Sequence, residues 1–385
     1  TYYWKVKIWD EAGTVSKWSD TQIFEMGLMN SENWGDSKWI TLNKDTRTSP
    51  HQFRDYITGR MQAPQKVNGF AASYFRNEVD ITKDIKNAQV YICGLGYYEL
   101  YLNGEKVGDH VLDPAPSNYD KQAYYVNYDI TEQVKSGQNA FGIILGNGFY
   151  GQNISWKRDP ESERDLAYGP PAVKLLVKLK YDDGTQADFY TDGTWKEATG
   201  PIVFNNIYGG DTYDARYEIN GWNTVGYKDE AWGNAKEASP KLKTISASQI
   251  PGIKKLKEFE PQNVFKGADG EWIVDFGQNI AGWVKLNVKE KEGQLIEVIT
   301  TEALLTDGSD IFKGSTGGGA NGMTQIYKYI CKGDGLESWE PKFSYHGFQF
   351  AKIKGISRKP DANMIKAVLV ATDIQETGRF KSSDD

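Results

Sequence analysis

Short apolar or alternating runs, each closed by Gly, Asn or Asp, fill this chain and constrain its fold more than any other feature. Examples are residues 90–93 (Val-Tyr-Ile-Cys), 98–102 (Tyr-Glu-Leu-Tyr-Leu) and 173–179 (Val-Lys-Leu-Leu-Val-Lys-Leu). Such runs are too short for helices and are rich in the residues that strands prefer. Asn103-Gly104 has the chemistry of a tight hairpin turn. Sustained helical periodicity is absent, so the sequence predicts an all-β chain of tandem β-sandwich or jelly-roll domains.

Length and charge bound the number of domains and the classes of partner. A chain of 385 residues exceeds the usual size of one domain and predicts two to three compact units. The formal net charge is −7, and the lysines and arginines are spread along the chain rather than gathered in the basic stripe that nucleic acid requires. No apolar run reaches the roughly 18 residues that span a bilayer. We therefore expect no nucleic-acid partner and no membrane span.

Turn-rich and Pro-bearing passages divide the sequence into four parts. Residues 1–28 form two alternating runs around a turn, and they resemble the last two strands of a fibronectin type III domain. Two strands alone are marginal in water, so we expect the chain to be cut at its start. Residues 33–239 are predicted to form a jelly roll and residues 240–374 a second β-sandwich. Residues 375–385 are expected to be a linker that leads out of the chain.

The cysteines and histidines predict neither a metal centre nor a catalytic triad. Cys93 and Cys331 each lie in an apolar run, so we expect buried free thiols, with a disulfide between them as the alternative. His51, His110 and His346 are too few and too scattered for a zinc site or a Ser-His-Asp triad.

Five motifs are longer and more specific than these patterns. They are residues 94–109 (Gly-Leu-Gly-Tyr-Tyr-Glu-Leu-Tyr-Leu-Asn-Gly-Glu-Lys-Val-Gly-Asp), 145–150 (Leu-Gly-Asn-Gly-Phe-Tyr), 210–216 (Gly-Asp-Thr-Tyr-Asp-Ala-Arg), 275–283 (Asp-Phe-Gly-Gln-Asn-Ile-Ala-Gly-Trp) and 339–348 (Trp-Glu-Pro-Lys-Phe-Ser-Tyr-His-Gly-Phe). The first three resemble the N-terminal, galactose-binding-like jelly-roll domain of bacterial α-L-rhamnosidases. In the third motif, Asp stands where the family usually has Glu. The last two resemble the β-sandwich that follows in that family.

The resemblance implies that catalysis lies outside this chain. In that family an (α/α)6 barrel follows these sandwiches, and its carboxyl groups hydrolyse the glycoside with inversion. The barrel is expected to begin close to residue 385, so no catalytic residue is assigned here. The implied function is that of non-catalytic modules that scaffold a multidomain α-L-rhamnosidase and bind sugar. Such an enzyme releases terminal rhamnose from glycans.

The same resemblance implies partners and a location, and two alternatives stay open. The expected partners are a rhamnose-containing glycan and the catalytic barrel of the same polypeptide. The expected location is extracytoplasmic, in the periplasm, at the cell surface or secreted. The first alternative is a freestanding surface lectin or adhesin with no enzyme attached. The second is a set of accessory modules from another glycan-degrading enzyme, such as a lyase.

Polar and aromatic residues near the third motif are the candidates for carbohydrate binding. Asn147 follows a predicted strand in a loop, and Tyr208 and Tyr213 flank two carboxylates that could meet a sugar. These carboxylates belong to Asp211 and Asp214. The alternative is that they serve loop structure or interdomain contacts through Arg216.

Loops on the same predicted rim carry candidate metal ligands. No cofactor is required by the resemblance, but calcium prefers several oxygen ligands from carboxylates, amides and carbonyls. Asp109, Asp113 and Asp120 supply such oxygens, with Asn118 and Asn153 nearby. The alternative is that they are polar turn residues in solvent.

Two further expectations concern the second sandwich. We expect Trp283, Trp339, Tyr345 and Phe348 to form an exposed apolar face that packs against the barrel, because aromatic residues dominate stable interfaces. We expect the Gly-rich run at residues 314–322 to be a mobile loop.

Overall fold

Strands are the main regular structure of the part of the chain that the structure describes. The computed structural model describes residues 2–43, 71–151, 168–304 and 325–383. These residues form 25 strands and no α-helix, with two short 3₁₀ helices, η1 (Ser31–Trp34) and η4 (Ala215–Tyr217). The prediction of an all-β chain of sandwich or jelly-roll domains is confirmed. Within the described ranges, no helix has the length and apolar character needed to cross a membrane.

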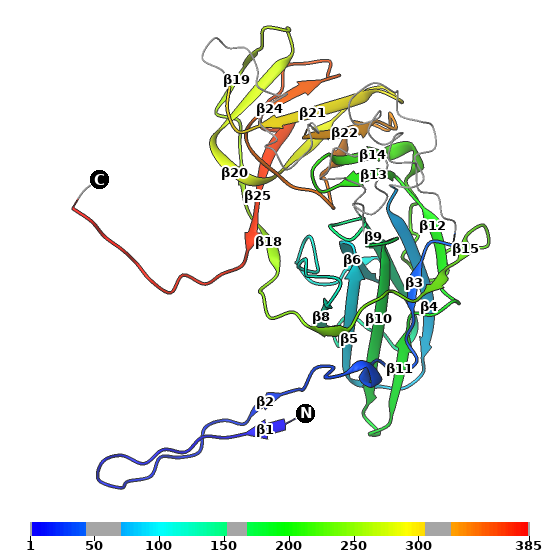
Figure 1. Ribbon diagram of the computed structural model, residues 1–385, viewed down its shortest axis with the longest axis vertical. Helices are drawn as coiled ribbons and strands as arrows, with labels where there is room; N and C mark the ends of the chain where they lie inside the picture. Colours follow the sequence, from blue (N-terminus) through cyan, green and yellow to red (C-terminus); the bar gives the residue numbers. More distant parts are fainter. Residues whose placement is uncertain (1, 44–70, 152–167, 305–324, 384–385) are drawn as a thin grey trace.

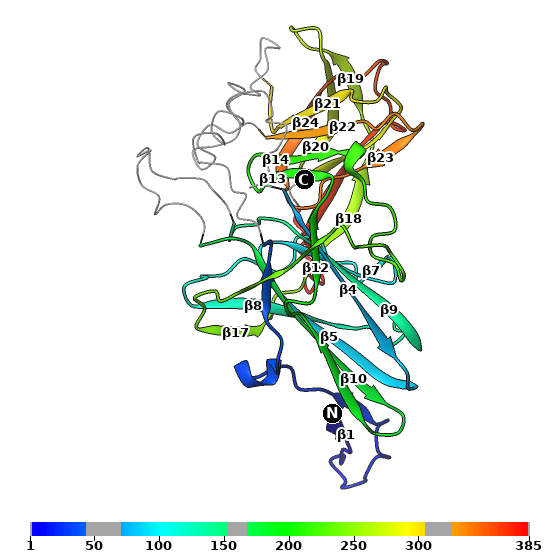
Figure 2. The ribbon, with the colours of Figure 1, turned by 90° about the vertical axis from the view of Figure 1, so that its right-hand side faces the viewer.

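Two sheets form the jelly-roll body (Figures 1 and 2). The strands of its first sheet are β3 (Trp39–Thr41), β5 (Ile85–Leu95), β8 (Gln122–Asp129), β10 (Ala172–Tyr181), β11 (Gln186–Tyr190), β16 (Lys236–Ala238) and β17 (Thr244–Ala247). The strands of its second sheet are β4 (Ser73–Ile81), β6 (Tyr98–Leu102), β7 (Glu105–Lys106), β9 (Gly137–Leu145), β12 (Lys196–Thr199) and β15 (Gly233–Asn234). Ile92, Phe141 and Val177 are among the fully buried residues that join the two sheets in one apolar core.

One large curled sheet forms the second body. Its strands are β13 (Ile202–Asn206), β14 (Gly210–Asp214), β18 (Ile253–Phe259), β19 (Asn263–Lys266), β20 (Trp272–Val288), β21 (Leu295–Thr301), β22 (Ile326–Ile330), β23 (Glu337–Trp339), β24 (His346–Lys354) and β25 (Ile365–Thr372). Strand β20 pairs with β19, β23, β24 and β25. It bends near Gly277, whose φ of +75° only glycine adopts without strain, and its pairing with β24 shifts register there. Before the bend β20 pairs with β19, and after it with β25 and β23.

The chain crosses between the two bodies more than once. Strands β13 and β14 follow β12 of the jelly roll, yet β14 pairs in parallel with β22 of the second body. Strand β17 returns to the jelly roll and pairs in parallel with β8. The limits expected for autonomous domains, residues 33–239 and 240–374, therefore stay a prediction.

The N-terminal residues form the expected hairpin. Strand β1 (Tyr2–Trp4) pairs antiparallel with β2 (Gln22–Phe24), and the rings of Tyr2 and Phe24 stack 5.0 Å apart. The hairpin extends away from the jelly roll (Figure 1). The hairpin is confirmed, whereas its assignment to a fibronectin type III domain stays a prediction.

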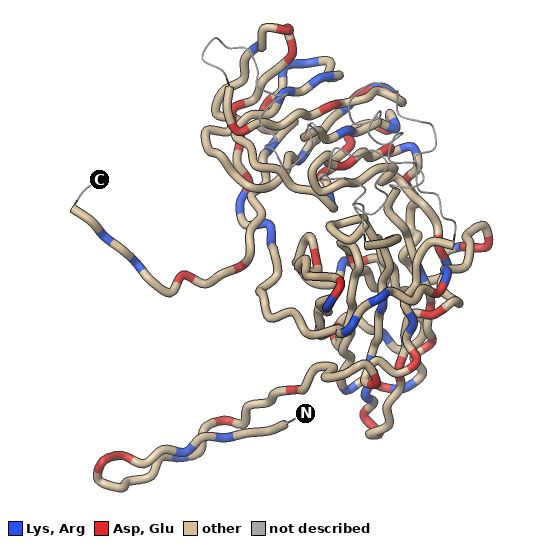
Figure 3. Tube along the Cα trace, viewed as in Figure 1, with Lys and Arg blue, Asp and Glu red and all other residues tan. Residues whose placement is uncertain are grey.

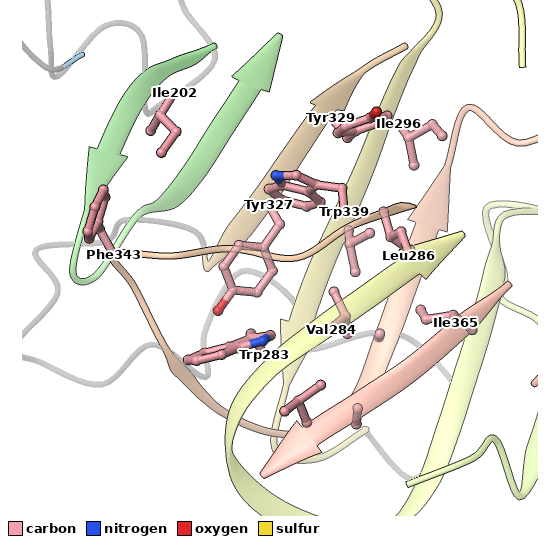
Figure 4. Packing of buried hydrophobic residues seen from close by; sticks show 14 of the residues in the cluster. Ile202, Trp283, Val284, Leu286, Ile296, Tyr327, Tyr329, Trp339, Phe343 and Ile365 are labelled. Carbon is pink, nitrogen blue, oxygen red and sulfur yellow. The ribbon is translucent and has the colours of Figure 1, made fainter. Parts of the chain in front are cut away.

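The aromatic residues expected on an exposed face are mostly buried, so that expectation is wrong. Trp283, Trp339 and Phe348 are 1%, 7% and 0% exposed, and only Tyr345 is accessible, at 37%. Figure 4 shows the rings of Trp283 and Trp339 inside the core of the curled sheet. They have partners within the chain: Trp283 donates its indole N–H to Glu340 Oε2 at 3.0 Å, and Trp339 packs on the ring of Tyr329. The curled sheet thus uses these rings for its own core.

The cysteines and charges agree with the sequence expectations. Cys93 and Cys331 are buried free thiols, and burial raises the pKa of both. Lys, Arg, Asp and Glu are interspersed along the described chain (Figure 3). The Gly-rich run at residues 314–322 and His51 lie outside the described residues.

Candidate functional site: a polar junction between the two bodies

Asp211 belongs to a largely buried polar junction, which we define as Glu99, Tyr101, Lys106, Asp211 and Lys342. Strand β14 places Asp211 between β13 and β22, where the residue is 2% exposed. One carboxylate oxygen accepts the backbone N–H groups of Lys342 and Phe343, at 2.9 and 3.1 Å. The other accepts the hydroxyl of Ser344 at 2.7 Å. Asp211 thereby fixes the segment that leads into β24.

Burial and hydrogen bonding act on Asp211 in opposite directions. Burial is the larger influence and raises the pKa of Asp211 above its usual value, while the three donors favour the carboxylate. A carboxylate whose oxygens are already occupied by protein donors is suited to holding a loop rather than to binding a sugar.

Glu99 and Lys342 connect the jelly roll to the same segment. Glu99 lies on β6, and its Oε2 is 2.7 Å from Nζ of Lys342. Its other oxygen is 3.2 Å from Nζ of Lys106, and Tyr101 donates its hydroxyl to Oε2 at 2.5 Å. Burial alone would raise the pKa of Glu99, but Lys342 and Lys106 outweigh it and hold the pKa at about 2. The carboxylate is therefore ionised and fully partnered.

Asn147 joins the junction from the jelly-roll side. It is 5% exposed, its backbone N–H donates to Oδ1 of Asn205 at 2.7 Å, and its side-chain amide donates to the Asn205 carbonyl at 2.9 Å. Asn205 is the register partner of Asp211 across β13 and β14. Next to Asn147, Gly146 lies so close to the ring of Phe343 that a Cβ there would be 2.4 Å from it. The loop at residues 145–147 is thus clamped against β13 and the 342–344 segment.

Tyr208, Tyr213 and Asp214 occupy the rim of the same region. Tyr213 stacks on Tyr329 at 5.8 Å. Asp214 caps η4 and forms an ion pair with Arg216, with Oδ2 2.7 Å from the guanidinium. The Arg216 contact was expected from the sequence and is confirmed. Tyr208 is half-buried, with its ring 6.4 Å from that of Phe149.

The five predicted sugar-binding residues therefore lie in one region. Asn147 and Tyr208 make contacts across the two bodies, whereas Asp211, Tyr213 and Asp214 contact other residues of the second body. Asn147, Asp211 and Asp214 are buried and bonded to protein, and the two tyrosines are partly accessible. Sugar binding by this set stays a prediction. Sequence reasoning missed Glu99, Lys106 and Lys342, although a lone acid inside the apolar run at residues 97–102 was a signal for a buried ion pair.

The three predicted calcium ligands are engaged separately. Asp109 is exposed and lies 3.0 Å from Nζ of Lys254. Asp113 is buried, accepts the hydroxyl of Tyr128 at 2.7 Å and lies 2.9 Å from Nδ1 of His110. Asp120 is exposed in a turn. Across the described ranges, no three His, Cys, Asp or Glu side chains gather closely enough to hold a metal ion. Calcium binding stays a prediction, and Asn153 lies outside the described residues.

Comparison with known proteins matches three parts of the chain to domain families. A family model described as "Alpha-L-rhamnosidase N-terminal domain" matches residues 83–257, and the "Bacterial alpha-L-rhamnosidase concanavalin-like domain" matches residues 265–371. Residues 1–30 match the "Rha78A-like, N-terminal immunoglobulin domain". This last match covers the hairpin.

Similar whole proteins are named as α-L-rhamnosidases. One from Formosa agariphila is 75% identical over 384 residues, which is 100% of this chain and 40% of that relative. The structure of an α-L-rhamnosidase from Dictyoglumus thermophilum superimposes with a TM-score of 0.83 at 35% identity, covering 99% of this chain and 40% of that one. The enzyme from Aspergillus terreus gives 0.81 at 29% identity, covering 99% and 41%. The chain spans about 40% of the length of the relatives named here.

The fold and the comparisons together define the class of protein: consecutive β-sandwich modules joined by buried polar contacts. Within that class, the chain belongs to the bacterial α-L-rhamnosidase family and corresponds to its N-terminal, non-catalytic part. The relatives named here are rhamnosidases, so the alternative of a freestanding lectin finds no support among them.

Proposed function

We propose that this chain is the scaffold of an enzyme that releases terminal L-rhamnose from glycans, and that it holds the catalytic barrel of the same polypeptide. The observation that carries the proposal is the 75% identity to an α-L-rhamnosidase along the whole chain, of which this chain spans 40%. The role of the chain is then structural, because buried charged residues at the junction hold its two bodies together.

The contacts of the buried carboxylates support a non-catalytic role. An inverting glycosidase needs one protonated and one ionised carboxyl group on either side of a sugar, about 6.5–9.5 Å apart. Glu99 is ionised and covered by Lys342 and Lys106, and Asp211 is covered by backbone donors. Neither has an oxygen free to protonate a leaving group or to activate water.

Enzyme assays on two lengths of polypeptide test this proposal. A polypeptide of the relatives' length that includes this chain should hydrolyse an aryl α-L-rhamnoside, and this chain alone should not. A matched aryl β-D-glucoside reports contaminating glycosidases. Hydrolysis by the short chain after repeated purification would refute the non-catalytic role. A long protein that leaves the rhamnoside intact would refute the proposed substrate.

An extracytoplasmic location belongs to the same proposal. A polymeric glycan does not cross a membrane intact, so an enzyme that trims its ends has to meet it outside the cytoplasm. Fractionation of the producing cell tests the location, and we expect the protein in the periplasmic, cell-surface or culture-medium fraction. Recovery from the cytoplasmic fraction alone would contradict it.

A further inference from the structure

The outer face of the first jelly-roll sheet is divided into an apolar half and a polar half. Side chains alternate along a strand, so residues two apart share one face. The apolar half carries Tyr91 and Cys93 of β5 and Leu176 of β10, which pack in one cluster with Leu28 and Trp34. The segment that runs from the hairpin through η1 therefore covers this half.

The polar half carries a grid of amide and charged side chains on the same three strands. The pairing register places Lys178 and Asp129 on either side of Gln89, and places Lys180 beside Asn87. Asn127 is the register partner of Tyr91 and donates its amide to Oε1 of Gln89 at 3.1 Å. Gln89 also lies opposite Asp129, its register partner on β8. Planar amides are thus held in fixed orientations on a rigid sheet.

A cavity of about 840 Å³ lies over this polar half. Gln89, Asn127 and Lys180 are among its lining residues, and Tyr3 and Phe24 line it from the hairpin. The segment that joins β17 to β18, including Ser248, contributes a further part of the lining. This volume falls within the roughly 300–1,000 Å³ of small-ligand sites.

The chemistry of the lining favours an uncharged, hydroxyl-rich ligand. Four carboxylates (Glu25, Asp113, Asp129, Asp373) and three ammonium groups (Lys86, Lys180, Lys254) line the cavity, so their charges nearly cancel. Among these, Lys254 pairs with Asp373 at 3.0 Å. Amide side chains can donate to and accept from hydroxyl groups, and aromatic rings cover the apolar face of a sugar.

We propose that this cavity, between the N-terminal hairpin and the polar half of the β5–β8–β10 face, binds a neutral oligosaccharide. Gln89 and Asn127 hydrogen-bond the sugar hydroxyls, and Tyr3 and Phe24 contact its apolar faces. The choice of a neutral glycan rests on the proposed function, while the site itself rests on the sheet register and the cavity. The site is separate from the junction cluster and uses no metal ion.

Side-chain amide resonances provide the test, with the disaccharide rutinose (rhamnosyl-glucose) as the probe. Titration of this whole chain should shift the NH₂ signals of Gln89 and Asn127, and the shifts should persist with a chelator present. The double variant Gln89→Ala, Asn127→Ala should bind roughly tenfold more weakly or worse, because each lost hydrogen bond contributes about one kcal/mol. The near-isosteric Asn127→Asp, which removes the donor and keeps the shape, should also weaken binding.

Asn77 supplies a matched control. Asn77 lies on β4 of the other jelly-roll sheet, and its amide donates to Oγ1 of Thr194 in the turn before β12, away from the cavity lining. Asn77→Ala should leave rutinose binding unchanged. Absence of shifts at millimolar rutinose would overturn the proposal, as would full binding by Asn127→Asp. If the longer protein hydrolyses a rhamnoside but this chain does not bind rutinose, only the cavity proposal is refuted. If this chain binds rutinose but the longer protein does not hydrolyse a rhamnoside, only the proposed function is refuted.

Discussion

Glu99 and Lys342 lie 243 residues apart in the sequence and form an ion pair of 2.7 Å between the jelly roll and the curled sheet. The Glu99 side chain is 9% exposed and the Lys342 side chain 30%, so the pair is largely shielded from water. Because Lys342 also presents its backbone N–H to Asp211, one residue connects two buried acids on different bodies. The junction is therefore a single polar unit, and its members should respond together to mutation.

Removing the Lys342 ammonium should destabilise the protein. Lys342→Met leaves a buried carboxylate with only Lys106 as a cation, at 3.2 Å, and we expect a loss of about 2–4 kcal/mol in the free energy of unfolding. Adding Glu99→Gln to this variant should recover part of the loss, since it removes the uncompensated charge. Urea unfolding measures both. The control is Lys178→Met, which breaks an exposed pair with Asp188 and should change stability by less than about 0.5 kcal/mol. An equal loss in both lysine variants would contradict this.

The contribution of Glu99 should depend on pH in a defined window. Its pKa in the folded protein is about 2, below the 4.5 of an unperturbed Glu. A lowered folded-state pKa stabilises the fold fully above the unfolded value, and that stability is lost as pH falls towards the folded value. The stability difference between the natural chain and Glu99→Gln should therefore be constant above about pH 5 and shrink towards about pH 3. A difference that stays constant down to about pH 3 would show that the carboxylate is not the titrating group.

Asp211 should stabilise the protein more through the hydrogen bonds that its oxygens accept than through its charge. Asp211→Ala removes the acceptor for two backbone N–H groups and the Ser344 hydroxyl, and unsatisfied buried donors cost about 1–3 kcal/mol each. Asp211→Asn keeps one carbonyl oxygen and should cost less. Hydrogen exchange should show faster exchange at Lys342 and Phe343 in the alanine variant. Unchanged protection there would remove the proposed role of Asp211 in fixing this segment.

The sequence predicted local features of this region and none of its long-range contacts. The Asn103-Gly104 turn between β6 and β7 has the positive φ values, +53° and +91°, that the dipeptide predicts. Asp214 meets Arg216 two residues away, within reach of sequence reasoning. Asp211, by contrast, binds a segment more than 130 residues further along, and no periodicity encodes that distance. The parallel pairing of β14 with β22 is equally hidden, because it joins two strands of one sheet that are far apart in the sequence.

The same reason explains the wrong expectation for the aromatic residues. A sequence run rich in Trp, Tyr and Phe shows the same pattern whether its side chains form a core or an interface. Trp339 is buried because its ring contacts those of Tyr327 and Tyr329 on β22. These rings meet only because the sheet is curled.

His346 should remain neutral at every pH at which the protein is folded. It is 1% exposed, and burial lowers its pKa to about 3. Its Nδ1 lies 3.0 Å from Thr300 Oγ1, and its ring stacks on Tyr327. Because the folded pKa lies below the unfolded value near 6.5, the unfolded chain takes up a proton first. Stability should then fall by about 1.4 kcal/mol per pH unit below pH 6.5 from this residue alone. His346→Gln should flatten that slope. An imidazole NMR signal of His346 that titrates near pH 6 in the folded state would refute the prediction that this residue stays neutral.

Calcium should bind weakly at the rim, because the candidate carboxylates of Asp109 and Asp113 already have partners within the protein. A cation at Asp109 competes with the Lys254 ammonium 3.0 Å away, and a cation at Asp113 competes with Tyr128 and His110. We expect calcium binding with a dissociation constant on the order of a millimolar, and rhamnose binding at this rim that a chelator abolishes. Lys254→Ala frees Asp109 and should tighten calcium binding several-fold, whereas Lys178→Ala, at another surface ion pair, should not. Calorimetry with calcium alone, then with L-rhamnose, measures both steps. An unchanged calcium affinity in Lys254→Ala would exclude Asp109 as a ligand, and rhamnose binding that persists with the chelator would exclude the metal.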